Sequence, residues 1–109
     1  MAETISFEEF KKLDIRIGKV LSAKAVAGSE KLIKMGVDLG SESRQIVAGI
    51  LQYYKPEELV GKNFVFLANL ESKNLMGLES QGMILCADRD GEPICLAPVK
   101  EVPSGTVVR

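Results

Sequence analysis

Apolar and polar residues alternate along much of this chain, which is the pattern of strands with one buried face. Leu13, Ile15 and Ile17 are separated by polar or small residues. The alternation fails at residues 18–20, and the glycine there predicts a bulge or sharp bend that lets one strand serve two sheets. A second strand follows a loop at residues 27–30. It places four apolar residues on one side: Ile33, Met35, Val37 and Leu39.

Later strands are less regular in their alternation. They are predicted at residues 44–50, 64–68 and 83–87, with a further apolar run at 94–96. Gly77 and Gly82 bracket a polar stretch that we interpret as a turn leading into the run from Met83. Asp90-Gly91 is a hairpin turn signal, and the tail from Pro98 to Arg109 has extended character.

Two short helices interrupt the strands. Ser6 and Glu9 have the spacing of a capping box, and Phe7 and Phe10 lie on one helix face, where we expect them to pin the helix to the body of the domain. A second helix is predicted over residues 55–60, because it has a proline at its start, acidic residues in its first turn and a glycine at its end.

Five strands with a helix between the third and fourth describe an all-β fold with short helices, the five-stranded oligonucleotide-binding (OB) barrel. An SH3-like barrel or a small sandwich would not need that helix. The 109 residues suffice for one domain with a core and no more. We therefore expect a single OB domain over residues 1–109, with an N-terminal helical turn and a C-terminal extension.

The composition is that of a soluble globular protein, with 46% hydrophobic and 27% charged residues. No stretch approaches the roughly 20 apolar residues that span a bilayer, and the acidic start at residues 1–4 lacks a signal-peptide pattern. We expect a cytoplasmic protein without a membrane partner.

Catalysis has few candidate groups here. The chain has no histidine for acid–base work near neutral pH, and it has neither a nucleophile elbow nor a Walker glycine–lysine loop. Two separated cysteines are too few for a usual zinc site. We predict no enzyme activity, no catalytic residues, no metal and no cofactor. Cys86 and Cys95 lie in apolar runs, which favours buried small side chains. A disulfide is possible if their strands pair, but the reducing cytosol argues against it.

The net charge of −1 argues against a nucleic-acid binder, but the distribution of the charges does not. Acidic residues gather elsewhere, while the stretch from residue 11 to residue 34 carries seven basic residues: Lys11, Lys12, Arg16, Lys19, Lys24, Lys31 and Lys34. Arg16, Lys19, Lys31 and Lys34 fall on or beside the first two strands, where OB barrels bind nucleic acid. Each could equally be ordinary solvated surface. The scarcity of aromatic residues favours recognition of folded RNA over general single-strand binding.

Six segments together resemble a known family: residues 10–20, 30–32, 44–49, 54–61, 68–70 and 80–83. The resemblance is to the tRNA-binding domain, found as a small structure-specific tRNA-binding protein and as the C-terminal domain or beta subunit of methionyl-tRNA synthetase. It implies a barrel that binds the outer corner of folded tRNA with little sequence preference. With the basic residues above, it gives nine candidate contact residues: Arg16, Lys19, Lys31, Lys34, Asn69, Lys73, Ser80, Gln81 and Met83.

The resemblance also implies a homodimer, to which the C-terminal part from about residue 92, and Val102 to Arg109 above all, would contribute. A synthetase catalytic chain is a further possible partner. The loop at residues 26–30 lacks the family's His-Pro type, and residues 73–76 are less basic than usual. Two alternatives stay open: a peptide-binding chaperone of the same dimeric fold, which lacks the Ser-Gln-Gly-Met sequence of residues 80–83, and a purely structural dimerisation domain.

Overall fold

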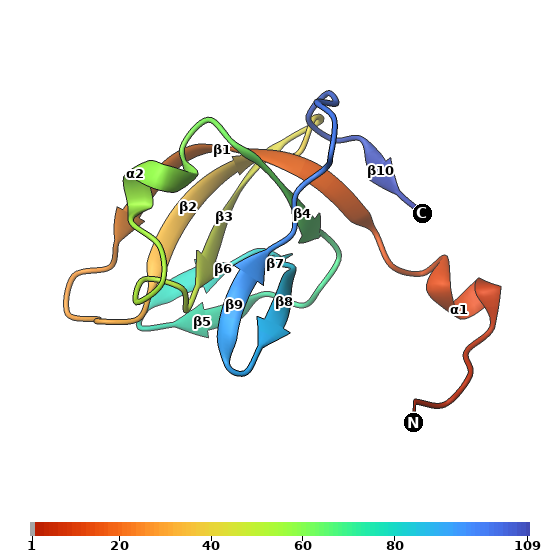
Figure 1. The fold of residues 1–109 in the computed structure, drawn as a ribbon, viewed down its shortest axis with the longest axis horizontal. Helices are drawn as coiled ribbons and strands as arrows, with labels where there is room; N and C mark the ends of the chain where they lie inside the picture. Colours follow the sequence, from red (N-terminus) through yellow and green to blue (C-terminus); the bar gives the residue numbers. More distant parts are fainter. Residues whose placement is uncertain (1) are drawn as a thin grey trace.

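The long strand β1 organises the barrel (Figure 1), in a computed structural model that describes residues 2–109. Its elements in chain order are α1 (Phe7–Phe10), β1 (Ile15–Ala25), β2 (Ile33–Asp38), β3 (Ser43–Ala48), α2 (Pro56–Leu59), β4 (Asn63–Leu67), β5 (Lys73–Leu75), β6 (Leu78–Ser80), β7 (Met83–Ile84), β8 (Cys86–Arg89), β9 (Glu92–Cys95) and β10 (Val107–Val108). The main sheet has the order β3-β2-β1-β4-β7, and β10 also pairs with β1. This nearly closed antiparallel barrel with short helices confirms the predicted fold class.

The predicted bulge in β1 is present, and the glycine beside it has a second role. The register between β1 and β2 shifts between Val20 and Ser22. A Cβ atom on Gly18 would lie 2.7 Å from Val37 Cγ1 and 2.9 Å from Phe66 Cδ2. Gly18 therefore allows the strands to pack closely across the barrel interior, and the bend itself lies three residues further on.

The core fills the barrel with aliphatic side chains around one phenylalanine. The alternation predicted for β2 is confirmed, since its apolar residues are buried and its polar residues are half-buried. Leu59 of α2 is also buried, so this helix covers one end of the barrel. The largest fully buried side chains are Phe66, Ile33, Met35, Leu39, Ile46, Leu59, Val20 and Val37.

At one end of the barrel the predicted Asp90-Gly91 hairpin is present between β8 and β9, but two other features differ from the prediction. Residues 77–82 do not form one turn: Met76 and Gly77 make a tight turn with φ of 50° and 82°, and Glu79 and Ser80 belong to strand β6. The strand predicted at residues 83–87 is split into β7 and β8. The β5–β6 and β8–β9 hairpins lie near each other at the end of the barrel opposite the β2–β3 turn (Figure 1).

The N-terminal helix forms as predicted but packs differently. Both hydrogen bonds of the Ser6–Glu9 capping box are present. The expectation that both phenylalanines pin the helix to the domain is wrong, because the Phe7 residue is 68% exposed. Its ring lies 6.3 Å from that of Phe10, and α1 stands away from the barrel (Figure 1).

Candidate nucleic-acid interface

Lysines surround three neighbouring hollows at the hairpin end of the barrel. Lys24 of β1 and Lys34 of β2 are register partners and line one hollow of about 320 Å³ together with Met76 and Leu78. We call this the lysine hollow. Met76 sits at the tip of the β5–β6 hairpin, so that hairpin reaches across to the outer face of β1 and β2.

A second hollow, of about 280 Å³, lies on the other side of the same hairpin. Leu70, Leu75 and Met83 give it apolar walls, and Lys73 stands at its edge. The Met83 residue is 42% exposed, so its thioether is available to a ligand. We call this the methionine hollow.

A third hollow, of about 490 Å³, contains Lys31 and Tyr53. It shares Gly49 and Cys86 with the methionine hollow. These two hollows are therefore continuous, and the β5–β6 hairpin lines both the methionine hollow and the lysine hollow. We call the surface that contains the three hollows the hairpin face. Its cationic and thioether residues are Lys24, Lys31, Lys34, Lys73, Met76 and Met83.

Ser80 lies beneath the hairpin face and is only 4% exposed. Its hydroxyl accepts a hydrogen bond from the Val47 N–H at 3.0 Å and donates to the Gly82 carbonyl at 3.0 Å. The free edge of β3 is held in this way against β6, and the Ser80 hydroxyl is bonded within the protein.

Gln81 also holds β3 against the segment that follows β6. Its backbone N–H donates to the Gln45 carbonyl at 2.8 Å, and its side-chain Oε1 accepts from the Gln45 N–H at 3.2 Å. Arg44 adds hydrogen bonds to the carbonyls of Ala68 and Gln81. Side chains from residues 80 and 81 therefore do what strand pairing does elsewhere in the barrel.

Asn69 is likewise occupied within the protein. Its Oδ1 accepts from the Asp14 N–H at 2.9 Å, and its Nδ2 donates to the Lys12 carbonyl at 2.5 Å. The amide thus ties the end of β4 to the segment between α1 and β1, and these two hydrogen bonds fix its orientation.

Arg16 is paired with Asp14 through two hydrogen bonds of 2.9 and 2.7 Å. The Arg16 hydrogen bond lowers the pKa of the Asp14 carboxyl, and the same bond raises the pKa of the guanidinium. A third bond of 3.3 Å reaches the Leu39 carbonyl. Arg16 therefore holds the other end of the barrel together and does not reach the hairpin face.

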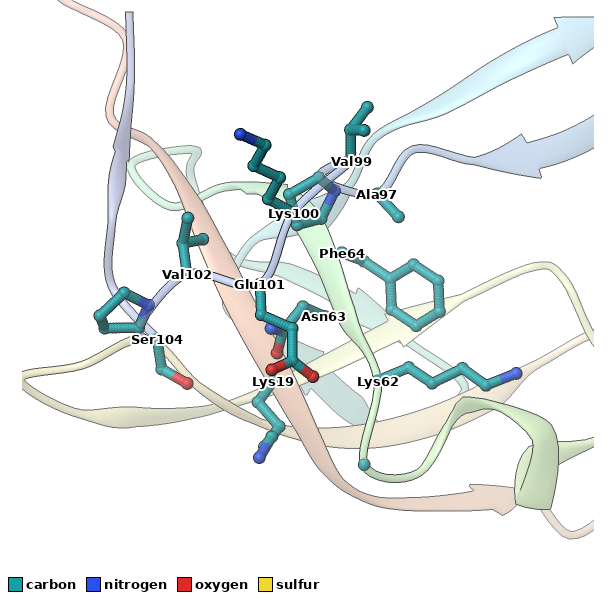
Figure 2. Close-up of a pocket in the computed structure, with 13 residues that line it drawn as sticks. Lys19, Lys62, Asn63, Phe64, Ala97, Val99, Lys100, Glu101, Val102 and Ser104 are labelled. Carbon is teal, nitrogen blue, oxygen red and sulfur yellow. The ribbon is translucent and has the colours of Figure 1, made fainter.

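Lys19 lies in a different groove, of about 510 Å³, between the start of β4 and residues 97–104. We call it the strap groove. Lys62 and Lys100 also line it, but the three ammonium groups point in different directions, with Glu101 among them (Figure 2). The four cations predicted to share a surface are thus divided: Lys31 and Lys34 lie on the hairpin face, while Arg16 and Lys19 do not.

Two of the cationic and thioether residues of the hairpin face were not among the nine candidates, Lys24 and Met76. Lys24 belongs to the basic stretch, and its pairing with Lys34 required the register of β1 on β2. Met76 gave no signal, because its position depends on the unpredicted β5–β6 hairpin.

Within residues 2–109, no cluster of three or more histidine, cysteine or acidic residues could hold a metal ion. No helix in that range is long and apolar enough to cross a bilayer.

Comparison with known proteins identifies the family to which this barrel belongs. Residues 15–107 match the family model described as "Putative tRNA binding domain". The chain belongs to the tRNA-binding domain family. A methionine–tRNA ligase of Archaeoglobus fulgidus is 58% identical over 106 residues, which are 97% of this chain and 16% of that protein. The chain therefore spans about a sixth of such relatives.

Solved structures of the family superpose closely. A MetRS-related protein from Pyrococcus horikoshii has a TM-score of 0.94 and 41% identity, and the match covers 99% of this chain and 100% of that one. The chaperone CsaA from Bacillus anthracis has a TM-score of 0.87 and 31% identity, over 98% and 100% of the two chains. The family resemblance predicted from the sequence is confirmed.

Proposed function

We propose that this chain binds folded tRNA through the hairpin face. The observation that carries the proposal is the set of four lysines around the three hollows, Lys24, Lys31, Lys34 and Lys73. Among residues 2–109, the ion pairs involve Lys11, Arg16, Arg44 and Arg89, and none involves these four. Their ammonium groups are therefore available to the phosphates of a ligand.

Binding combines electrostatic capture with shape. Phosphate contacts give affinity and position without reading sequence, which suits a ligand recognised by its overall fold. Met76 and Met83 add soft, adaptable apolar contacts where aromatic side chains are scarce. The raised hairpin between the lysine and methionine hollows presents a corner that a bent, paired RNA can follow.

The nine candidate residues take three roles in this proposal. Lys31, Lys34, Lys73 and Met83 contact the RNA. Ser80, Gln81, Asn69 and Arg16 position the elements that carry those contacts, because each makes hydrogen bonds that fix it within the protein. Lys19 contributes only long-range charge from the strap groove.

The chain acts without catalysis in this proposal. Methionine–tRNA ligase activity belongs to relatives of which this chain spans 16%. We propose that it raises the local concentration of tRNA, either alone or as an accessory to a methionyl-tRNA synthetase catalytic chain.

A homodimer is part of the proposal. Apolar side chains are exposed around the two chain ends, with Phe7, Val99 and Val107 at 68%, 101% and 54%. The extension from about residue 92 to residue 109 and helix α1 would cover one another's apolar side chains in a symmetric pair. Sedimentation equilibrium of the chain and of a Phe7→Ser, Val107→Ser variant tests this: the variant is expected to be monomeric, and a wild-type monomer at micromolar concentration would refute it.

A gel-shift series across salt concentrations tests RNA binding. Release of counterions from about four phosphates of a paired RNA predicts that affinity falls on the order of 150-fold between 50 and 200 mM salt. Folded tRNA should bind more tightly than the same tRNA denatured and annealed to a complementary strand. An affinity that does not respond to salt would remove the proposal.

A second candidate is peptide binding, which the similarity to the chaperone CsaA favours. The methionine hollow, with its apolar walls, could accept an apolar side chain of a peptide. This function predicts binding of an unfolded polypeptide that Met83→Ala weakens and Lys34→Glu leaves unchanged, whereas tRNA binding must respond to Lys34→Glu.

A further inference from the structure

Two thiols face each other across the β8–β9 hairpin. Cys86 and Cys95 are register partners, and their Sγ atoms are 3.7 Å apart. They are the chain's two cysteines, and both are free and half-buried. The proposed RNA contacts use neither, so the pairing of two reactive groups calls for its own explanation.

Hydrogen bonds around the pair define its geometry. The Cys95 N–H donates to the Tyr54 hydroxyl, outside the hairpin, at 3.1 Å, and the Leu96 N–H donates to the Leu85 carbonyl at 3.1 Å. Because bonded and non-bonded pairs alternate in an antiparallel ladder, Cys86 and Cys95 form a non-hydrogen-bonded pair. In such pairs the Cα atoms are about 4.5 Å apart and the side chains lie close together.

That spacing falls within the Cα separation of roughly 4.4–6.8 Å that disulfides bridge. Shortening the present sulfur separation to a bond of about 2.05 Å requires rotation of the two side chains and leaves the strand register unchanged. Tyr54 also donates its hydroxyl to the Pro93 carbonyl at 3.1 Å. The Tyr54 hydroxyl therefore holds β9 through two hydrogen bonds, and the hairpin keeps the two sulfur atoms close to each other.

We infer that Cys86 and Cys95 form a reversible intrachain disulfide by exchange with a low-molecular-weight disulfide such as glutathione disulfide. The thiolate of one cysteine attacks one glutathione sulfur and releases one glutathione thiolate, which gives a mixed disulfide. The other cysteine then loses its proton and attacks the sulfur of the first, releasing the second glutathione. Two electrons pass to the oxidant, and the protein loses two hydrogen atoms.

The surroundings of Cys86 affect the rate of this exchange. Burial, together with the neighbouring Cys95, raises the pKa of the Cys86 thiol to about 12, which lowers its thiolate fraction and slows its reaction with an external disulfide. Since Cys86 lines both the methionine hollow and the third hollow, the bond would fix the wall between them.

Intact-mass measurement after alkylation tests the inference on the full chain. The protein is equilibrated in buffers of rising glutathione disulfide content, quenched with iodoacetamide and weighed, both folded and in urea. We expect a monomeric product about 2 Da lighter and carrying no alkyl group, which dithiothreitol reverses. The folded chain should need about tenfold less oxidant than the chain in urea, because the fold holds the sulfurs together.

Matched variants separate this chemistry from other oxidation. Cys95→Ser and Cys86→Ser should each retain one alkylatable or glutathionylated sulfur and never show the 2 Da loss. Dialkylated wild-type protein in oxidising buffer, a mixed disulfide as the end product, or equal oxidation in urea would each overturn the inference. None of these measurements depends on RNA binding. A failure of the disulfide test therefore leaves the RNA-binding proposal untouched, and the reverse also holds.

Discussion

The hairpin face and the strap groove both carry lysines, yet the structure organises them differently. On the hairpin face, register pairing puts Lys24 beside Lys34. The β5–β6 hairpin brings Lys73 and Met76 to the same surface, and β7 adds Met83. In the strap groove, Lys19, Lys62 and Lys100 point apart around Glu101 (Figure 2). A count of basic residues does not distinguish the two surfaces, but the arrangement of those residues on the barrel does.

Charge reversal on the two surfaces should give the largest contrast. Lys31→Glu with Lys34→Glu removes two phosphate contacts and adds repulsion, so tRNA affinity should fall on the order of 100-fold. Lys19→Glu with Lys62→Glu changes the net charge by the same amount and should cost about threefold or less. Filter binding at one fixed salt concentration measures both. Equal losses would mean that total charge, and no particular surface, determines binding.

Removing the Ser80 hydroxyl should affect the fold as well as binding. Ser80→Ala leaves the buried Val47 N–H without its acceptor, which costs about 1–3 kcal/mol of unfolding free energy. Tyr53→Phe is a matched loss of an exposed hydroxyl nearby and should leave stability unchanged. Urea unfolding measures both, and an unaltered midpoint for Ser80→Ala would return Ser80 to the contact residues.

Met83→Ala should act on binding alone. The side chain lies at the surface of the methionine hollow, so its loss should weaken tRNA binding about threefold to tenfold and leave the urea midpoint nearly unchanged. Leu21→Ala, another exposed apolar residue on the barrel but outside the three hollows, is the control. If both variants bind tRNA equally well, the methionine hollow is not part of the interface.

Local chemistry made much of the barrel predictable. Alternation gave β2, the Ser6–Glu9 spacing gave a capping box, and Asp90-Gly91 is a tight turn with φ of 50° and 92°. The closure between β3 and β6 could not be predicted in the same way, because it depends on the hydroxyl of Ser80 reaching a backbone group 33 positions away. The β5–β6 hairpin was missed because Met76 takes a positive φ that other residues adopt more readily.

The pairing of Arg16 with Asp14 could have been predicted from the sequence. Residues two apart on an extended segment point to the same side, so Asp14 could have been expected to neutralise Arg16. Glu42 and Arg44 repeat the spacing, and their side chains are paired as well. A cation two positions from a carboxylate on a strand is therefore a weaker candidate for RNA contact than one flanked by apolar or small residues, as Lys34 is.

The Asp14–Arg16 pair gives the smallest expected effect. The pKa of Asp14 is lower in the folded protein than its ordinary value, so the pair stabilises the fold above that value. The contribution is lost as the pH falls below about 4 and Asp14 becomes protonated. Both side chains are partly exposed, at 32% for Asp14 and 23% for Arg16, which limits the gain to about 1 kcal/mol.

Asp14→Asn isolates this effect, since it keeps the backbone N–H that Asn69 binds and removes only the charge. The difference in unfolding free energy between wild type and variant should be present at pH 6 and shrink progressively as the pH falls below about 4. tRNA affinity at pH 7 should be unchanged, because Arg16 lies away from the hairpin face. A gain in affinity for Asp14→Asn would show that freeing the guanidinium creates an RNA contact, and it would extend the interface to the opposite end of the barrel.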